Sequence, residues 1–241
     1  ALGVVAATAC AGIIVGVVVK TGLGLSLANS LVKLAGGSIM LTLFLVMIAS
    51  LVLGMGAPTT ANYVITSTIA APAIITLLSP NTPMELVPLV TVMSAHFFVF
   101  YFGIIADITP PVALAAFAAS GISGGDPILT GVNSAKLAIA AFIIPYMIVL
   151  QPALLMVDVT IPQIIWVTFS AIIGMVGIGA GIIGYWYRKL MWFERIILIG
   201  AGLAMIYPET ISDITGLVVF AIMFVIQFSG NKKEDGPKAI V

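Results

Sequence analysis

One turn constrains the fold of this chain more than any other feature. Residues Gly54–Thr60 read Gly-Met-Gly-Ala-Pro-Thr-Thr, and they separate two long runs without a charged residue, Ser38–Leu53 and Ala61–Leu78. A turn in water normally carries Asp, Asn, Lys or Ser beside its Gly and Pro, whereas this turn carries Met and Ala. Non-helical backbone at membrane depth is tolerated only where protein covers it or where it lines a polar cavity. We therefore expect a helical hairpin whose tip is buried in a membrane protein and forms a candidate binding site.

The composition excludes a water-soluble fold. Of the 241 residues, 61% are hydrophobic and 7% are charged, and the mean hydropathy is +1.26, whereas soluble domains carry about 25% charged residues. The nine basic and nine acidic residues cancel, so the charge gives no case for a nucleic-acid partner. The single cysteine, Cys10, lies in an apolar run, and we expect it in the core.

The pattern divides the chain into four segments. Residues 1–37 predict a scaffold helix and then an amphipathic helix in the membrane interface, because leucines recur there at helical spacing, at Leu23, Leu27, Leu31 and Leu34. Residues 38–158 contain the hairpin, a broken helix and the helix that follows it. Residues 159–229 predict the C-terminal helices, and residues 230–241 form a charged tail that we expect to be disordered.

A pair of prolines interrupts the next helical segment. Leu86–Ser120 is longer than one membrane span and contains Asp107-Ile-Thr-Pro-Pro111. Two consecutive prolines remove two backbone donors and clash with the preceding turn, so the helix must open there. A Gly-rich polar loop is expected next, at Gly121–Lys136, and further helices at Leu137–Val157, Ile161–Tyr185, about Met191–Tyr207 and Ile211–Phe228. The expected fold is an all-α polytopic membrane protein with about six transmembrane helices, one outward-opening helical hairpin and one Pro-Pro-broken helix.

The orientation follows from the distribution of basic residues in short loops. One expected loop carries Arg188, Lys189 and Arg195, and the tail carries Lys232, Lys233 and Lys238; two helices separate them, so both lie on the same, cytoplasmic side. Counting back places Lys136 inside and the acidic positions Glu85, Asp158, Glu209 and Asp213 outside. The hairpin therefore enters from the outer face. Lys20 and Lys33 are the two basic residues that this topology places on the outer side of the membrane, against the rule.

Asp107 is the one carboxylate far from any expected loop. A charge at the centre of a membrane helix costs about 2.5–3.5 kcal/mol on insertion scales, so a functional role is the default interpretation. The alternative is that Asp107 caps the helix that starts at Pro110–Pro111, and the two roles are compatible. An intramembrane hydrolase would need a second carboxylate at this depth, and the other acids lie at segment ends or in loops. We therefore do not expect an enzyme.

Two other features favour structural interpretations. His96, the only histidine, lies among aromatic residues, and a hydrogen-bonded core histidine is favoured over a proton relay. Five glycines give one helix a smooth face that predicts close helix packing and not a binding site, at Gly174, Gly177, Gly179, Gly181 and Gly184.

The two broken elements together predict an ion and substrate site. Broken helices that meet near the membrane midplane are how secondary transporters build such sites. The carbonyls released near Gly54 and Ala106, with the hydroxyl of Thr109, are hard oxygen ligands that suit Na⁺. The alternative is that a water or the Asn62 amide satisfies these carbonyls. The candidates for substrate binding are the polar and proline residues of the two elements, Pro58, Thr59, Thr60, Asn62, Asp107 and Pro110.

These motifs resemble the large membrane subunit of TRAP transporters, the tripartite ATP-independent periplasmic systems. The resemblance is carried by Gly54-Met-Gly-Ala-Pro-Thr-Thr-Ala-Asn-Tyr, by Ala106-Asp-Ile-Thr-Pro-Pro and by Ala119-Ser-Gly-Ile-Ser, and it covers about Leu41–Pro152. The sequence of the hairpin turn and the helices at the C-terminal end are most similar to those of the fused permeases of the TAXI branch. Ala106 stands where the family often has glycine, and Asp107 is not part of the general pattern.

The resemblance implies a Na⁺-coupled, elevator-type importer of organic acids in the cell inner membrane. It implies that this chain holds the second of two inverted repeats. The implied partners are the N-terminal half of the permease, a small membrane subunit or its fused equivalent, and a periplasmic substrate-binding protein. The alternatives are another elevator-type carrier of dicarboxylates or citrate, and a membrane subunit that only scaffolds a complex.

Overall fold

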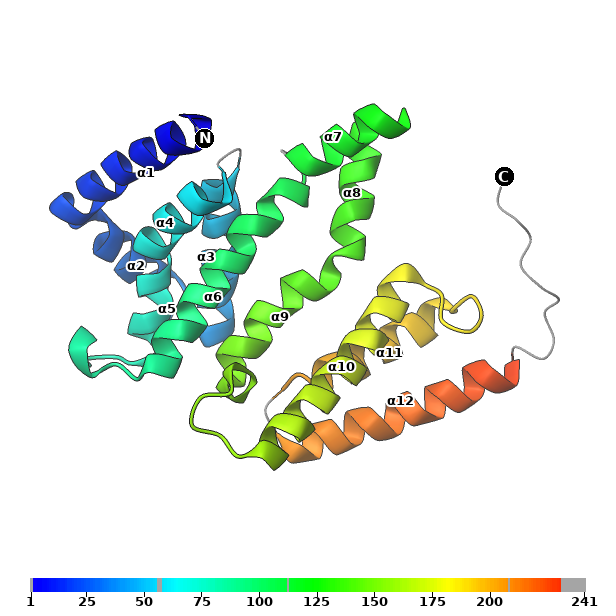
Figure 1. The fold of residues 1–241 in the computed structure, drawn as a ribbon. Helices are drawn as coiled ribbons and strands as arrows, with labels where there is room; N and C mark the ends of the chain where they lie inside the picture. Colours follow the sequence, from blue (N-terminus) through cyan, green and yellow to red (C-terminus); the bar gives the residue numbers. More distant parts are fainter. Residues whose placement is uncertain (1, 56–57, 112, 208, 231–241) are drawn as a thin grey trace. The chain divides into compact units, whose positions relative to one another are not determined.

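The chain folds almost entirely into helices, in two compact units. The computed structural model describes residues 2–55, 58–111, 113–207 and 209–230, and this part of the chain contains no strand. The units are Ala1–Val157 and Asp158–Val241 (Figure 1). The first contains α1 (Leu2–Thr21), α2 (Leu23–Leu34), α3 (Ile39–Gly54), α4 (Thr59–Ile69), α5 (Ala71–Leu78), η1 (Met84–Leu86), α6 (Leu89–Ile105), η2 (Ala106–Ile108), α7 (Leu114–Ser123), α8 (Pro127–Leu137), α9 (Ile139–Leu150) and η3 (Pro152–Leu155). The second contains α10 (Ile161–Ile183), α11 (Trp192–Ala204) and α12 (Thr210–Gly230).

The helical hairpin is present at the expected position. Its first arm is α3, and its second arm is α4 followed by α5, which begins beside Pro72. Gly56 and Ala57, at the centre of the tip, lie outside the described residues. The helix–turn–helix prediction is therefore confirmed on both sides of the tip.

Aromatic side chains of α6 and α9 hold the hairpin in the core of the first unit. Phe98 and Phe102 are fully buried, with ring centroids 4.8 Å apart. Tyr146 of α9 lies 5.1 Å from Phe98 and 5.9 Å from Phe102 in edge-on geometry. Leu43 and Val46 of α3 belong to the same buried cluster. Full burial of each such side chain contributes about 1.5–3 kcal/mol, so this cluster fixes α3 against α6.

The Pro-Pro break is also where the sequence places it. The α-helix α6 ends at Ile105, continues as the short 3₁₀ segment η2, and α7 begins only at Leu114. The expected polar loop at Gly121–Lys136 is wrong, because α8 occupies most of it. The Asp126 carboxylate accepts a hydrogen bond of 2.7 Å from the Leu129 amide, and Pro127 follows it at the first helical position, which together start a helix.

Several large side chains of the first two helices are exposed among the residues whose burial the structure describes. The expected amphipathic helix is present as α2, but Leu23, Leu27 and Leu34 are exposed, and Ala28 is the fully buried residue. The prediction that Cys10 lies in the core is wrong, because its thiol is exposed on α1. A long apolar run in a membrane protein need not face protein, because lipid also accepts it.

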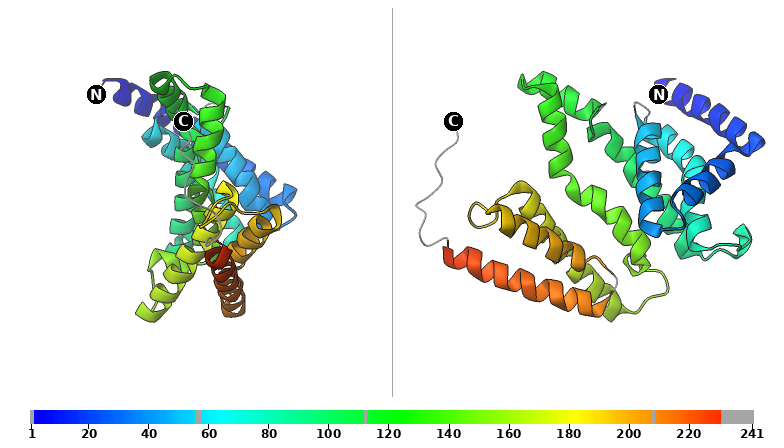
Figure 2. Two further views of the ribbon diagram at one scale, coloured as in Figure 1. Left: turned by 90° about the vertical axis from the view of Figure 1, so that its right-hand side faces the viewer. Right: turned by 180° about the vertical axis from the view of Figure 1, so that it is seen from behind.

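The second unit is a bundle in which α11 packs between α10 and α12 (Figures 1 and 2). The glycine face of α10 packs closely, as the sequence predicts. A Cβ at Gly174 would lie 2.9 Å from the Gly202 carbonyl oxygen, and one at Gly181 would lie 2.9 Å from the Arg195 carbonyl oxygen. Gly179 is the exception, with open space around it. Arg195 lies within α11 and not in the loop where it was expected.

Among the described residues, four helical segments are long and apolar enough to cross a membrane, and a fifth is possible if the bent pair α8–α9 is one span. The four are Thr59–Leu78, Leu89–Ile108, Ile161–Ile183 and Ile211–Phe228. The last three lie at expected spans, whereas Thr59–Leu78 is the second arm of the hairpin. The expected span at about Met191–Tyr207 is too short to cross, because α11 has only 13 residues. The chain is a helical, multi-pass membrane protein.

Candidate functional site

The hairpin tip and the helix break meet at two glycines and one amide. Asn62, near the start of α4, is 2% exposed, and its Nδ2 donates to the Gly103 carbonyl at 2.6 Å and weakly to the Gly54 carbonyl at 3.5 Å. A Cβ at Gly54 would lie 2.6 Å from Asn62 Nδ2, 2.9 Å from the Gly103 oxygen and 3.0 Å from the Ala106 Cβ. Glycine is therefore required at Gly54, because no side chain fits between α3, α4 and α6 here. We call Gly54, Asn62, Gly103 and Ala106 the junction.

The junction contains an unused polar atom. Asn62 Oδ1 is buried and has no hydrogen-bond partner among the described residues. Buried amide oxygens are normally paired, so an unpaired one needs an explanation in terms of a ligand, an ion or a water. The Ser50 hydroxyl, one helical turn before Gly54 on α3, is likewise buried and without a partner in the described part of the chain.

The Pro-Pro break places the other predicted ion ligand at its edge. The Thr109 hydroxyl donates to the Ile105 carbonyl at 2.7 Å, and the Thr109 amide donates to the Ala106 carbonyl at 3.3 Å. The Thr109 amide would pair with the Ile105 carbonyl in an α-helix but bonds to Ala106 instead, so the hydroxyl satisfies the Ile105 carbonyl and keeps its own lone pairs free. Asp107, in η2, is partly buried. The alternative role as a helix cap is not seen, because α7 starts after Ala113 without a side-chain cap.

The remaining candidates lie around the junction without forming part of it. Pro58, Thr59 and Thr60 are exposed in this chain, while Pro110 is half-buried. Gly103 is a junction residue that the sequence reasoning missed. The spacing in the sequence could have indicated it. Gly103 lies three residues before Ala106 and four before Asp107, which places it on the same face of the helix as these two predicted positions.

A second polar pair lies on the same two helices, with Tyr63 directly after Asn62 on α4 and His96 seven residues before Gly103 on α6. The Tyr63 hydroxyl and His96 Nδ1 are 2.9 Å apart. These two residues, with Phe97 and Phe100, line a hollow of about 230 Å³. His96 is thus hydrogen-bonded, as expected, but it is only partly buried and faces a cavity, so its placement in the core is wrong.

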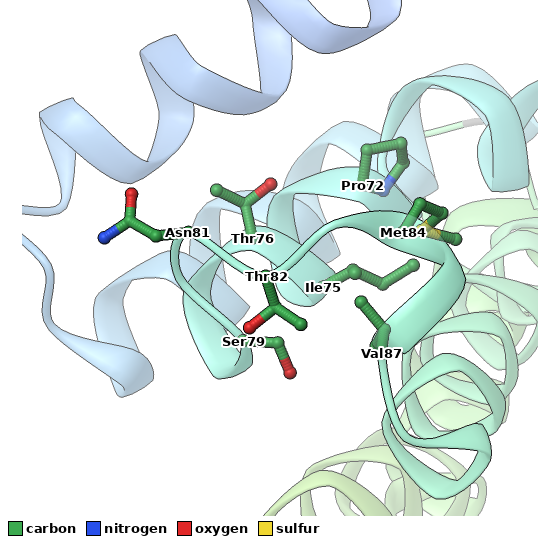
Figure 3. Close-up of a pocket in the computed structure, with 8 residues that line it drawn as sticks. All are labelled: Pro72, Ile75, Thr76, Ser79, Asn81, Thr82, Met84 and Val87. Carbon is green, nitrogen blue, oxygen red and sulfur yellow. The ribbon is translucent and has the colours of Figure 1, made fainter.

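Another hollow of about 230 Å³ lies where α5 meets η1 (Figure 3). Pro72, Ile75, Met84 and Val87 gather at one side of it, and the Thr76 hydroxyl points away from those of Ser79 and Thr82. A specific site needs polar groups that converge. The hollow is therefore mainly apolar, and it has no converging polar groups that could recognise a ligand.

Metal ions that prefer nitrogen, sulfur or several carboxylates have no obvious site. Among the described residues, no three His, Cys, Asp or Glu side chains come together. The oxygen atoms at the junction are carbonyl and amide oxygens, which are ligands for hard cations of low charge.

Comparison with known families decides the class of this protein. Residues 1–164 of the 241 match the family described as "Tripartite ATP-independent periplasmic transporter, DctM component". The chain belongs to this family. It is therefore a transporter permease of the membrane, and the DctM match contains the hairpin, the junction and the Pro-Pro break.

The DctM match ends at the start of α10. Residues 164–215 match a second family, a domain of unknown function (DUF3394), which covers most of α10, all of α11 and the first turns of α12. No curated protein and no solved structure matches the chain.

Proposed function

We propose that this chain is the C-terminal half of a TRAP-type permease that imports an organic acid together with Na⁺. In this proposal a periplasmic substrate-binding protein delivers the acid, and an N-terminal half with a small membrane subunit, or its TAXI-type fused equivalent, completes the transporter. The protein lies in the inner membrane with its C-terminal tail in the cytoplasm, so that the hairpin opens outward and moves by an elevator mechanism. The membership in the DctM family supports the class of transporter, and the distribution of basic residues supports the orientation.

The observation that supports a bound Na⁺ in this proposal is the unpaired Asn62 Oδ1 at the junction. A buried amide oxygen without a donor costs about 1–3 kcal/mol, and a cation would remove that cost. The residues present therefore fit Na⁺, with Asn62, the Gly54 and Ala106 carbonyls and the Thr109 hydroxyl as the groups that would hold it. Bound Na⁺ would supply positive charge beside a site for a carboxylate.

The substrate would lie on the polar side of the same two elements. Pro58, Thr59 and Thr60 present hydroxyls and a rigid backbone at the start of α4, where the helix dipole favours an anion. Asp107 and Pro110 border this region from the break. Because Asp107 would repel a carboxylate, its role in this proposal is to contact hydroxyl or cationic groups of the substrate.

The alternative is that the Asn62 amide, and not an ion, satisfies the carbonyls at the junction. Its Nδ2 already reaches the Gly103 carbonyl at 2.6 Å and the Gly54 carbonyl at 3.5 Å. The longer of these two contacts is weak, so Gly54 still has capacity for a second partner. Both interpretations pair the Gly103 carbonyl with Asn62 Nδ2. They differ in which group pairs with Asn62 Oδ1 and with the Gly54 carbonyl.

Uptake by the full-length permease in proteoliposomes tests the proposal. A panel of radiolabelled mono- and dicarboxylates is offered from outside, with the cognate binding protein, in Na⁺ or in K⁺ buffer. We expect at least a tenfold lower initial rate in K⁺, because the coupling ion is missing. Uptake that is unchanged in K⁺ but is lost when a pH gradient is dissipated would contradict Na⁺ coupling, and uptake that does not require the binding protein would contradict the proposed partner.

A further inference from the structure

The loop between α10 and α11, residues 184–191, lies at the end of two segments that are long enough to cross a membrane. α10 ends at Ile183. The end of α12 reaches the same loop, because the Arg188 amide donates to Gln227 Oε1 at 3.3 Å (Figure 1). At 23 residues, α10 is about 35 Å long, which matches a hydrocarbon core of about 30 Å. The loop therefore lies at the depth of the lipid headgroups.

The backbone of this loop forms a defined turn. The Leu190 amide donates to the Gly184 carbonyl at 2.9 Å, and Tyr185 pairs with Lys189 in an antiparallel bridge. Gly184 has a φ of +82°, a conformation that glycine adopts readily and other residues do not. The turn therefore holds Lys189 beside the end of α10.

Arg195 of α11 brings a second cation to the same turn. Its Nε donates to the Gly181 carbonyl and its Nη2 to the Ile182 carbonyl, both at 2.7 Å, so the side chain caps the end of α10. A Cβ at Gly184 would lie 3.3 Å from Arg195 Nη1, which places the guanidinium against the turn. Two of its five N–H groups are used in this way, and the other three have no acceptor among the described residues.

The positive charges of Lys189 and Arg195 have no carboxylate partner in the described part of the chain. The ion pair of this region joins Arg188 to Glu194 at 2.6 Å. Lys189 and Arg195 are exposed, whereas Glu194 is 2% exposed, so its carboxylate is not available at the surface. The other buried acid of the unit, Asp213, bonds to side chains of α10 far from this turn. The loop therefore presents two positive charges that an anionic partner can compensate.

Exposed aromatic side chains surround the two cations. Trp192 is 75% exposed, Tyr185 is 58% exposed and Phe193 is 43% exposed. Tyr and Trp are enriched at the boundary between lipid and water, where the ring meets acyl chains and the polar atom reaches the headgroups. A free anion would contact the cations alone and gives no reason for the exposed rings. A phospholipid accounts for both features, because it has a phosphate and acyl chains.

We propose that the α10–α11 loop binds an anionic phospholipid, with Lys189 and Arg195 donating hydrogen bonds to its phosphate and Trp192 lying beside its acyl chains. Hydrogen bonds from charged donors to a phosphate are stronger than neutral ones, and an anionic leaflet attracts basic residues. This inference goes beyond the proposed function, because it depends neither on the transported acid nor on the coupling ion. It gives the region that matches the domain of unknown function a role as a lipid-binding anchor.

Competition for a fluorescent lipid tests this assignment in the purified full-length permease. The probe is phosphatidylglycerol with a label on one acyl chain, and the competitors are unlabelled phosphatidylglycerol, phosphatidylcholine and glycerol 3-phosphate, which has the phosphate without the chains. Lys189→Gln should weaken phosphatidylglycerol about fivefold, the effect of one basic residue at an anionic surface, and leave phosphatidylcholine unchanged. Lys189→Arg keeps the charge and should retain the affinity. The matched control, Lys33→Gln, removes an exposed lysine of the first unit and should leave both lipids unchanged.

Three results would each overturn the proposal. Equal binding of phosphatidylglycerol and phosphatidylcholine would show no preference for an anionic lipid, as expected if another subunit covers the loop. Equal losses from Lys189→Gln and Lys33→Gln would reduce the effect to net charge. Displacement of the probe by glycerol 3-phosphate as effectively as by phosphatidylglycerol would show a site for a free anion. Na⁺-dependent uptake is unaffected by any of these results, so this proposal and the proposed function fail separately.

Discussion

The two units differ in how they satisfy their buried polar oxygen atoms. In the first unit, Asn62 Oδ1 and the Ser50 hydroxyl are buried without a partner among the described residues. In the second unit, Glu194 is 2% exposed, and both of its carboxylate oxygens are bonded, to Arg188 Nη2 at 2.6 Å, to the Met191 amide at 2.8 Å and to Gln227 Nε2 at 3.1 Å. The network is not complete, because Arg188 Nε is buried without a partner among the described residues. A largely satisfied network makes a bundle rigid, whereas unpaired oxygen atoms leave capacity for a ligand.

The opposite end of the bundle follows the same rule. The Asp213 carboxylate, 4% exposed, accepts hydrogen bonds from Trp166 Nε1 at 3.0 Å and from the Ser170 hydroxyl at 2.7 Å. Each of its two oxygens therefore has a donor. Among the described residues, the buried carboxylates, Glu194 and Asp213, lie in the bundle. The buried oxygen atoms without a donor, Asn62 Oδ1 and the Ser50 hydroxyl, lie in the hairpin.

Glycine also has different uses in the two units. In the bundle, Gly174 and Gly202 allow two helix backbones to approach, because a Cβ at Gly202 would lie 2.5 Å from the Gly174 carbonyl oxygen. At the junction, Gly54 and Gly103 make room for one side chain, the amide of Asn62, which would lie 2.6 Å and 3.1 Å from a Cβ at these two positions. The first use brings two helix backbones together, and the second makes room for a buried polar side chain.

The largest expected effect is the loss of the buried acid of the bundle. Glu194→Ala leaves Arg188 and Gln227 without their acceptor, and breaking a buried ion pair costs about 3–5 kcal/mol. We expect the free energy of unfolding in detergent micelles to fall by about 3 kcal/mol or more. The control is Glu209→Ala, because Glu209 is an exposed acid of the same unit. A loss below about 1 kcal/mol would contradict the idea that the bundle depends on its paired charges.

A smaller effect is expected at the junction. Gly54→Ala forces a Cβ against Asn62 and the backbone of Gly103, and overpacking of this kind costs about 1–3 kcal/mol. Uptake by the full-length permease should fall more than stability does, because the Asn62 amide is displaced from its position. The control is Gly200→Ala in α11, where nothing lies within 4 Å of an added Cβ; it should leave stability unchanged or raise it by at most about 1 kcal/mol. Equal effects of the two substitutions would remove the distinction between the units.

Local patterns were sufficient to predict the broken elements. The uncharged turn at Gly54–Thr60 and the prolines Pro110–Pro111 determine where helices end, because glycine and proline act on the backbone within one turn. The glycine face of α10 was predicted for the same reason. The start of α8 was missed although Asp126 and Pro127 are a complete local signal, since the neighbouring glycines suggested a loop.

The three-dimensional partners of side chains could not be read from the sequence. The sequence assigned Asp213 to the outer side of the membrane, which stays a prediction, and it gave no sign that the carboxylate is buried against Trp166 and Ser170. His96 was placed in the core, although it faces a hollow. In each case the residue type and its neighbours in the chain are compatible with both placements. The packing of a distant helix decides between them, and a single sequence gives no direct signal for that contact. The charged tail at residues 231–241 lies outside the described residues, so its expected disorder stays a prediction.

The smallest expected change in stability comes from the break. Thr109→Val keeps the shape of the side chain and removes the hydroxyl that donates to the Ile105 carbonyl at 2.7 Å. Loss of one such hydrogen bond costs about 0.5–1.5 kcal/mol, so the protein should still insert and fold. The apparent affinity for Na⁺ in uptake assays should fall several-fold, because one oxygen ligand is lost while the substrate contacts remain.

Asp107→Asn is the contrast that makes this last prediction decisive. The substitution keeps an oxygen at the same place and removes the negative charge, so a Na⁺ site built from carbonyl and hydroxyl oxygens should retain most of its affinity. If Asp107→Asn abolished uptake while Thr109→Val left the Na⁺ response unchanged, the coupling would depend on a titrating carboxylate, and protons would replace Na⁺ as the coupling ion. The comparison between the units would then change as well, because the first unit, like the second, would depend on a buried charge. A Na⁺ response that is weakened by Thr109→Val and retained by Asp107→Asn instead supports a neutral oxygen site at the junction.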